Sequence, residues 1–161
     1  MANIIMARVD ERLIHGQGQV WIKMLDCNTV IVANDKASTS DLEQSLMKTV
    51  VPESIAVRFY SIEKLIEVIE KANPKQKIFL VVKDLEDINK LVRGNVPITH
   101  INLGNIHNSE GKEKITRSIF LSEKEKEIIR SLIKDYGITF DTKTTPNEGN
   151  TSAEVDIVKY L

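Results

Sequence analysis

The sequence predicts an α/β fold: a single domain with a mostly parallel sheet, helices on both faces, and an active-site loop after the first strand. Short apolar runs alternate along the whole chain with longer amphipathic stretches. Such regular alternation favours parallel strands joined by crossover helices. One run, Ile78–Val82, is apolar at every position, which is typical of a strand covered on both faces.

Composition limits the classes of function. The 161 residues suffice for one domain with a proper core, spanning residues 1–161. A net charge of −1 gives no electrostatic footprint for nucleic acid. No apolar run approaches the roughly 20 residues of a membrane span, and the start of the chain lacks the features of a signal peptide. We therefore expect a cytoplasmic protein. Cys27 is the only cysteine, so an internal disulfide or a thiolate metal cage is excluded, and we expect a small buried hydrophobe there.

The expected elements follow in order. Apolar runs predict strands over 4–7, 30–33, 55–60, 78–82, 98–103, 115–121 and 138–142. Helices are expected after most of them, beginning at the capping residues Ser40, Ser61, Asp84 and Ser122. They end near Pro52, Pro74, Gly94 and Gly137, the last two as glycine caps. Residues 144–152 read as a loose connection, and 153–161 as a short helix or a segment docked on the core.

One stretch concentrates the chemistry: Arg8-Val9-Asp10-Glu11-Arg12-Leu13-Ile14-His15-Gly16-Gln17. It is expected to form the turn between the first strand and a helix that carries Trp21 and Leu25. Neutral imidazole is a nucleophile, and arginine binds phosphate oxygens through paired donors. A histidine flanked by arginines near a helix amino terminus is therefore a candidate phosphoryl site. A solvated cluster of ion pairs is an equally good interpretation from the spacing alone.

Other polar residues follow the other expected strands. Asp35, Ser61, Asp84 and the loop that starts at Gly104 should lie with His15 at the carboxyl edge of the sheet, where ligands bind in open α/β folds. A carboxylate pair for acid–base work could be drawn from Asp10, Glu11 and Asp35, although capping and ion pairing with the arginines are the simpler roles.

Two further classes of site fit poorly. A dinucleotide site would need a third glycine after Gly16 and Gly18, which instead suit a tight turn or a close approach of backbone amides to phosphate. The histidines His15, His100 and His107 lack metal-ligand spacing, so no metal site is expected. His100 reads as a structural histidine. His107 reads as a solvated loop residue, on a loop that should face the same edge as His15.

The stretch from Arg8 to Gln17 resembles the active-site signature of the enzyme IIB subunit of the mannose/fructose/sorbose branch of the bacterial sugar phosphotransferase system. The resemblance extends to Val32-Ala33-Asn34-Asp35, Ile101-Asn102-Leu103-Gly104-Asn105 and Val155-Asp156-Ile157-Val158. Ala56-Val57-Arg58-Phe59 and Gly104-Asn105-Ile106-His107 are most similar to N-acetylgalactosamine or galactosamine subunits.

The resemblance implies a phosphocarrier enzyme that works through a phosphohistidine intermediate. His15 would accept a phosphoryl group from phosphohistidine on a IIA subunit, on its Nδ1 atom. It would pass the group to a sugar held by the membrane subunits IIC and IID. Arg8 and Arg12 match the arginines of the family and would stabilise charge. Asp10, Gly16 and Gln17 would bind the phosphoryl group, with no metal or diffusible cofactor.

Three points stay open at this stage. The insertion-like Gly18-Gln19 departs from the family pattern and predicts a first helix that begins late or is shifted by one residue. The sugar could equally be mannose, fructose or sorbose, and a homodimer is possible. The competing class is a non-catalytic α/β module that binds a phosphorylated ligand.

Overall fold

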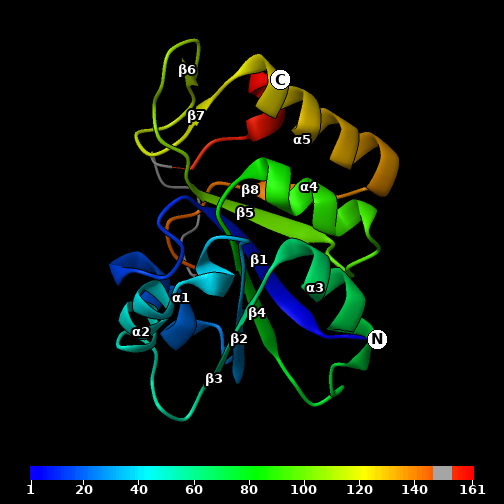
Figure 1. Ribbon diagram of the computed structural model, residues 1–161. Helices are drawn as coiled ribbons and strands as arrows, with labels where there is room; N and C mark the ends of the chain where they lie inside the picture. Colours follow the sequence, from blue (N-terminus) through cyan, green and yellow to red (C-terminus); the bar gives the residue numbers. More distant parts are fainter. Residues whose placement is uncertain (147–153) are drawn as a thin grey trace.

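A computed structural model describes residues 1–146 and 154–161 of the chain. Its main sheet has six parallel strands in the order β3-β2-β4-β1-β5-β8 (Figure 1). The strands are β1 (Ile4–Asp10), β2 (Thr29–Ala33), β3 (Ala56–Tyr60), β4 (Ile78–Val82), β5 (His100–Asn105) and β8 (Thr139–Asp141). The predicted fold class is confirmed. Because all six strands are parallel, their carboxyl ends lie at one edge.

Helices cover both faces of this sheet (Figure 1). One face carries α1 (Gly16–Met24) and α2 (Asp41–Lys48), and the other carries α3 (Ile62–Val68), α4 (Leu85–Arg93) and α5 (Glu123–Tyr136). Short 3-10 helices are η1 (Ala37–Thr39), η2 (Ile69–Lys71) and η3 (Ile157–Tyr160). The core under α1 and α2 draws its strand residues from β1 to β4. On that face the far strands β5 and β8 carry polar side chains instead, which matters for the site.

The predicted helix starts are confirmed by their caps. In α2, α3, α4 and α5 the capping side chain accepts a hydrogen bond from the backbone amide three residues on. Ser122 and Glu125 form a reciprocal capping box at the start of α5. Gly137 closes that helix with a left-handed φ of 66°.

Helix α4 ends at Gly94 as predicted, but this glycine cap is not left-handed. Gly94 has a φ of −83°, and Asn95 takes the left-handed conformation with a φ of 67°. Gly94 is needed for space, because a Cβ there would lie 2.7 Å from Cδ1 of Ile66 on α3. The glycine thus allows α3 and α4 to pack closely.

The strand predicted over 115–121 is wrong in extent. Only a small antiparallel hairpin forms, from β6 (Glu113–Lys114) and β7 (Phe120–Leu121). Ile115 and Ile119 are buried, and Ile119 bridges to Ile106 at the end of β5. The apolar residues in this range alternate because the turn between β6 and β7 places Ile115 and Ile119 in the core, and not because the range is a strand.

The remaining predictions concern the start of α1, the carboxyl-terminal segment, Cys27 and the lack of a membrane span. Helix α1 begins at Gly16, so Gly18-Gln19 does not delay it. The connection predicted over 144–152 lies in part outside the described residues, as does Ala153. Beyond it, η3 docks through the buried side chain of Ile157. Cys27 is buried, as expected. Among the described residues, no helix is long and apolar enough to cross a membrane.

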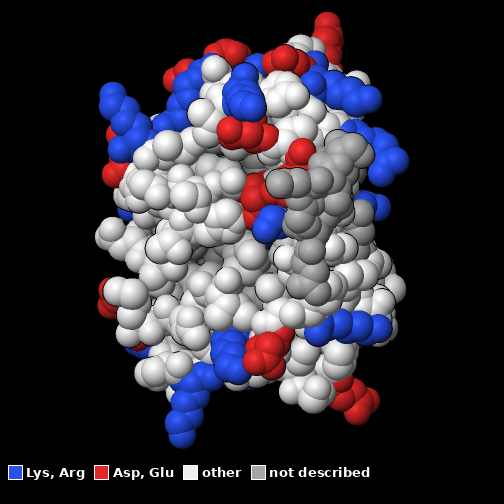
Figure 2. Space-filling view, turned by 180° about the vertical axis from the view of Figure 1, so that it is seen from behind, with Lys and Arg blue, Asp and Glu red and all other residues white. Residues whose placement is uncertain are grey.

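The surface carries both signs of charge. Figure 2 shows the face opposite to that of Figure 1, where uncharged side chains cover much of the surface, charged side chains of both signs gather toward the upper and lower ends, and one acidic and one basic group lie near the centre. No single-sign basic face appears in this view, in keeping with the net charge of −1.

Candidate active site

Strand β1 runs further than the apolar pattern predicted, since Arg8 and Asp10 are strand residues rather than turn residues. Both are buried, at 1% and 0% exposure. Their charges are tolerated inside the sheet because they pair with each other, with Nη2 of Arg8 lying 3.2 Å from Oδ2 of Asp10. The turn proper therefore begins at Glu11.

The loop that follows is pinned to the core by its apolar residues. Leu13 has a φ of 56°, and its amide donates to the carbonyl of Asp10 at 2.8 Å. Leu13 and Ile14 are both buried in the core under α1 and α2. A left-handed leucine is strained, and burial of its side chain offsets that cost. The tight loop brings His15 back toward the end of β1.

His15 meets Asp10 directly. Its Nε2 lies 2.8 Å from Oδ2 of Asp10, and its side chain is 19% exposed. A carboxylate can only accept, so Nε2 carries the hydrogen and Nδ1 of the neutral ring keeps its lone pair. The contact with Asp10 thus makes the two imidazole nitrogens chemically unequal.

Asp10 is the centre of the hydrogen-bond network. Besides His15 and Arg8, it accepts from Nδ2 of Asn105 at 2.9 Å and from the backbone amide of Arg12 at 2.9 Å. Burial alone would raise the pKa of Asp10. The hydrogen bond from His15, the charge of Arg8 and the remaining donors outweigh it and hold that pKa below its usual value. Asp10 is therefore an anion at neutral pH.

Arg8 is contacted from several directions through its Nη atoms and the face of its guanidinium. Nη1 donates to Oδ1 of Asn102 at 2.5 Å, and the guanidinium lies over the ring of Trp21, 5.2 Å from its centroid. A Cβ at Gly104 would lie 2.3 Å from Cζ of Arg8, so only glycine leaves room for it. Burial lowers the pKa of Arg8 and Asp10 partly offsets this, but an arginine remains protonated.

The residues around Arg8 and Asp10 were not singled out by the sequence. Gly104 was expected only as the start of a loop at the carboxyl edge, Asn102 and Asn105 appeared only within a matching segment, and Asp141 was only part of the strand predicted over 138–142. In the β1–β5 ladder, Arg8 lies opposite Asn102 and Asp10 opposite Asn105, with a register shift between the two pairs. The available signal was a run of polar residues, Asn102 and Gly104-Asn105, in an otherwise apolar strand.

The second predicted arginine lies elsewhere. Arg12 is exposed in the loop, whereas Arg8 is enclosed. Gly16 is exposed at the first position of α1, and Gln17 is in the first turn of that helix. The backbone amides of this turn have no acceptor within the helix, as at any helix start.

The other candidates have structural partners. Oε2 of Glu11 lies 2.8 Å from Nδ1 of His107, which brings the loop after β5 against the active-site loop. Asp35 accepts from the amide of Ile62 at 2.9 Å, and Asp84 caps α4. The structure thus brings the carboxyl ends of the strands together as predicted, but most of these side chains hold neighbouring elements in place.

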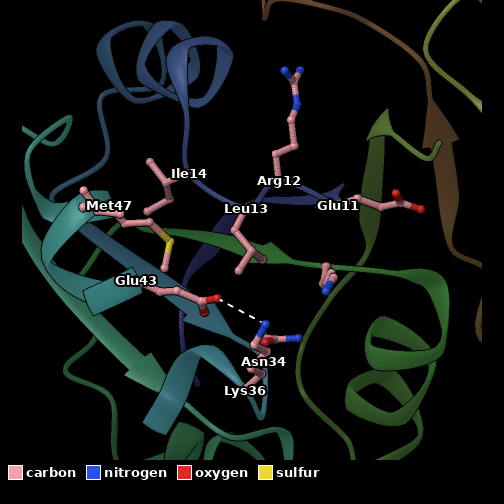
Figure 3. Close-up of a pocket in the computed structure, with 10 residues that line it drawn as sticks. Glu11, Arg12, Leu13, Ile14, Asn34, Lys36, Glu43 and Met47 are labelled. Atoms are coloured by element: carbon pink, nitrogen blue, oxygen red, sulfur yellow. Dashed lines mark ion pairs between the residues drawn. The ribbon is translucent and has the colours of Figure 1, made fainter. Parts of the chain in front are cut away.

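The loop also lines a cavity of about 270 Å³, and His15 is not among the residues that line it. Figure 3 shows Leu13, Ile14 and Met47 along the cavity, with Arg12 pointing away. Nζ of Lys36 and Oε1 of Glu43, two further lining residues, form an ion pair 3.6 Å apart. Within residues 1–146 and 154–161, no group of three His, Cys, Asp or Glu side chains is placed to hold a metal ion.

Comparison with known proteins assigns the family. The sequence profile of the sorbose subfamily IIB component of the phosphotransferase system (PTS) matches residues 4–160. An N-acetylgalactosamine-specific phosphotransferase enzyme IIB component 2 from Escherichia coli (strain K12) is 39% identical over 162 residues, covering 100% of both chains.

Two more relatives place this match in context. The crystal structure of a PTS-dependent N-acetyl-galactosamine IIB component from Streptococcus pyogenes superposes with a TM-score of 0.94 at 60% identity, covering 99% of this chain and 98% of that one. A mannose-specific EIIAB component from Escherichia coli (strain K12) is 30% identical over 131 residues, covering 79% of this chain and 40% of that protein. With a profile match over nearly its full length, the chain belongs to the sorbose subfamily of IIB components of the phosphotransferase system.

Proposed function

We propose that this protein accepts a phosphoryl group on Nδ1 of His15 from a phosphohistidine on a IIA subunit. It then transfers the group to a sugar held by the membrane subunits IIC and IID. The observation that carries the proposal is the 2.8 Å contact between Nε2 of His15 and the buried, anionic Asp10. It leaves Nδ1 with the lone pair that attacks phosphorus while the bond from phosphorus to the donor imidazole breaks.

The surrounding groups take distinct roles in this proposal. Asp10 orients His15 and balances the positive charge that develops on the ring when Nδ1 becomes bonded to phosphorus. It does this through the ring and not by binding the phosphoryl oxygens, since it is fully buried and an anion itself. Arg8, also buried, fixes Asp10. The exposed Arg12 and the backbone amides of Gly16 and Gln17 stabilise the charge of the phosphoryl oxygens. Protein groups suffice for this reaction, without a metal or cofactor.

The proposals for the acceptor sugar, the partner subunit and the cellular location are supported by the relatives. Two of them carry N-acetylgalactosamine in their names, and we propose that sugar, or galactosamine, as the acceptor. The mannose relative joins A and B components in one chain, which supports a IIA partner for this one. We further propose that residues 1–161 act as one IIB domain in the cytoplasm, bound peripherally to the membrane complex. A homodimer is compatible with this arrangement.

The test is the intact mass after incubation with phosphoenolpyruvate, the two general phosphocarrier proteins and the IIA subunit encoded beside this gene. We expect a gain of one phosphoryl group that acid removes and that His15→Ala abolishes. His107→Ala is the matched control, a half-exposed histidine on the neighbouring loop, and should still be phosphorylated. Absence of a gain from a demonstrably phosphorylated IIA would contradict the carrier role and favour a non-catalytic binding module.

The sugar is tested separately, with membranes that contain IIC and IID. Phosphorylated protein should lose its label to N-acetylgalactosamine or galactosamine and retain it with mannose, fructose or sorbose. Transfer to mannose at an equal rate would contradict the proposed substrate class and leave the histidine chemistry intact.

A further inference from the structure

A row of polar side chains crosses three strands of the sheet on the face that carries α1. Arg8 of β1 lies opposite Asn102 of β5, and Asn102 lies opposite Asp141 of β8. Nη1 of Arg8 donates to Oδ1 of Asn102, and Nδ2 of Asn102 donates to Oδ1 of Asp141 at 2.6 Å. The row therefore connects the last strand of the sheet to the arginine beside the active-site carboxylate.

Asp141 and the carbonyl of Lys143 together determine which way the amide of Asn102 points. An asparagine side chain has one acceptor oxygen and one donor nitrogen, and the guanidinium of Arg8 can only donate. Nδ2 of Asn102 is engaged by Asp141 and by the carbonyl of Lys143, 2.9 Å away. Its oxygen then faces Arg8. Without the negative charge of Asp141 the hold on Nδ2 is weaker, so the oxygen is placed less firmly against the guanidinium.

Asp141 itself is firmly held as an acceptor. His100 bonds to its Oδ2, and the backbone amide of Lys143 donates to its Oδ1 at 2.8 Å. Burial would raise the pKa of Asp141, but His100 and the other donors keep it below the usual value. The anionic carboxylate at the end of the row also adds to the attraction that keeps Arg8 charged.

The same segment of chain fixes Arg8 from a second direction. The ring of Trp21 lies against the guanidinium, and its Nε1 donates to the carbonyl of Thr144 at 2.9 Å. Residues 141–144 thus hold both Asn102 and Trp21, the two side chains that enclose Arg8 on the sides away from Asp10.

We propose that Asp141 and Asn102 are positioning residues for phosphoryl transfer, which set the guanidinium of Arg8 against Asp10 and thereby the orientation of His15. This inference rests on the proposed function. The effect passes through contacts alone: Asp141 orients Asn102, Asn102 holds Arg8, and Arg8 holds Asp10 at the position from which it meets Nε2 of His15. None of these steps needs Asp141 to approach the phosphoryl group.

The test measures the rate of phosphorylation by purified phospho-IIA. Asp141→Asn and Asn102→Leu should lower kcat by roughly 10- to 100-fold, since small misplacements of reacting groups have effects of that size. The KM for phospho-IIA should stay within about twofold, because Asn102 is buried and the side chain of Asp141 is only 12% exposed, which leaves them little surface for a donor to contact. Asp26→Asn, at a carboxylate whose side chain is 91% exposed, is the matched control and should behave as the native chain.

Two further variants separate positioning from general damage to the fold. In an Arg8→Lys background, Asp141→Asn should add no further loss, because its effect passes through the guanidinium. The exchange of Asn102→Asp with Asp141→Asn retains an acceptor for Arg8 and should recover part of the rate lost in either single variant. Native kcat in a folded Asp141→Asn variant, or an equal loss in both backgrounds, would overturn the proposal.

A separate readout distinguishes failure of this proposal from failure of the proposed function. The chemical shift of the Arg8 Nε–H group in the NMR spectrum depends on the surroundings of the guanidinium, whether or not the protein accepts a phosphoryl group. It should shift in Asp141→Asn and not in Asp26→Asn. An unchanged resonance refutes the positioning of Arg8, whereas a shift in a protein that is never phosphorylated refutes only the phosphoryl chemistry.

Discussion

Oδ2 of Asp10 lies 2.8 Å from Nε2 of His15 and 2.9 Å from Nδ2 of Asn105, so one buried oxygen holds both the imidazole and the strand beside it. The two nitrogens of the imidazole are made unequal by this contact. Nε2 meets the carboxylate, and Nδ1 is the nitrogen that we propose attacks phosphorus. An imidazole fixed in this way would lose little orientational freedom in the transition state.

Replacement of Asp10 by asparagine tests the centre of this arrangement. Asp10→Asn should lower the rate of His15 phosphorylation by roughly 100-fold, because the ring loses its fixed tautomer and orientation. The charge of Arg8 is then buried without its carboxylate, so the free energy of unfolding should fall by about 3–5 kcal/mol. Phosphorylation kinetics and urea unfolding measure the two effects. A folded variant with native transfer would show that the contact between Asp10 and His15 is not needed.

The stability of the protein should fall in acid because two carboxylates, one buried and one largely buried, have lowered pKa values. Asp10 and Asp141 both titrate below their usual value in the folded protein. Their contribution is complete above the unfolded pKa of about 4 and is lost as the pH falls through the lower folded pKa. Urea unfolding between pH 6 and pH 2 measures this loss. Asp141→Asn should show a shallower loss than the native chain, and an equally steep one would contradict the assignment.

Asp87 should have the opposite effect on stability. Burial, followed by the charge of Asp84, raises the pKa of Asp87 to about 6. Its contribution is therefore present below the unfolded pKa of about 4 and is lost as the pH rises through 6. Asp87→Asn should stabilise the protein by about 1–2 kcal/mol at pH 8 and by less at pH 5, measured by urea unfolding. Glu86→Gln on the same helix, where Lys124 lowers the pKa of the glutamate, should give no such gain.

The close approach of Arg8 to Gly104 predicts that this glycine cannot be replaced. In Gly104→Ala the new Cβ would lie 2.3 Å from Cζ of Arg8, so the guanidinium must shift from the position in which it contacts Asn102 and Asp10. We expect a loss of about 1–3 kcal/mol in the free energy of unfolding, together with slower phosphoryl transfer. Gly16→Ala is the control for stability, because a Cβ at that position would have no atom within 4 Å of it. Equal stability of the two variants would contradict the packing described.

The sequence predicts the frame of the molecule well because its signals are local. Capping residues, apolar runs and the histidine loop each act over a few positions, and the caps of α2 to α5 appear where they were expected. All the strands of the main sheet run parallel, so their carboxyl ends lie at one edge, as expected. Asp35 and Asp84 follow β2 and β4 at this edge.

The buried network could not be predicted in the same way, because its members are far apart in the sequence. Arg8 and Asn102 are separated by 94 positions, and their pairing depends on the register of β1 and β5. This also explains why Arg8 and Asp10 were placed in a turn. Their charges end the apolar run, and only distant partners make a strand with two buried ions stable. At 115–121 the alternation of apolar and polar residues predicted a strand that does not form over this range. Ile115 and Ile119 instead flank a turn between the short strands β6 and β7.

The span of these contacts has a consequence for the order in which the protein is made. Trp21 and Thr144 are 123 positions apart, and Asn102 and Asp141 are 39 apart. During translation His15 is synthesised early. Arg8 can bind Asn102 only after Asn102 has been synthesised, and Asn102 can bind Asp141 only later still. The surroundings of His15 are therefore complete only after the segment from Asp141 to Thr144 has been synthesised.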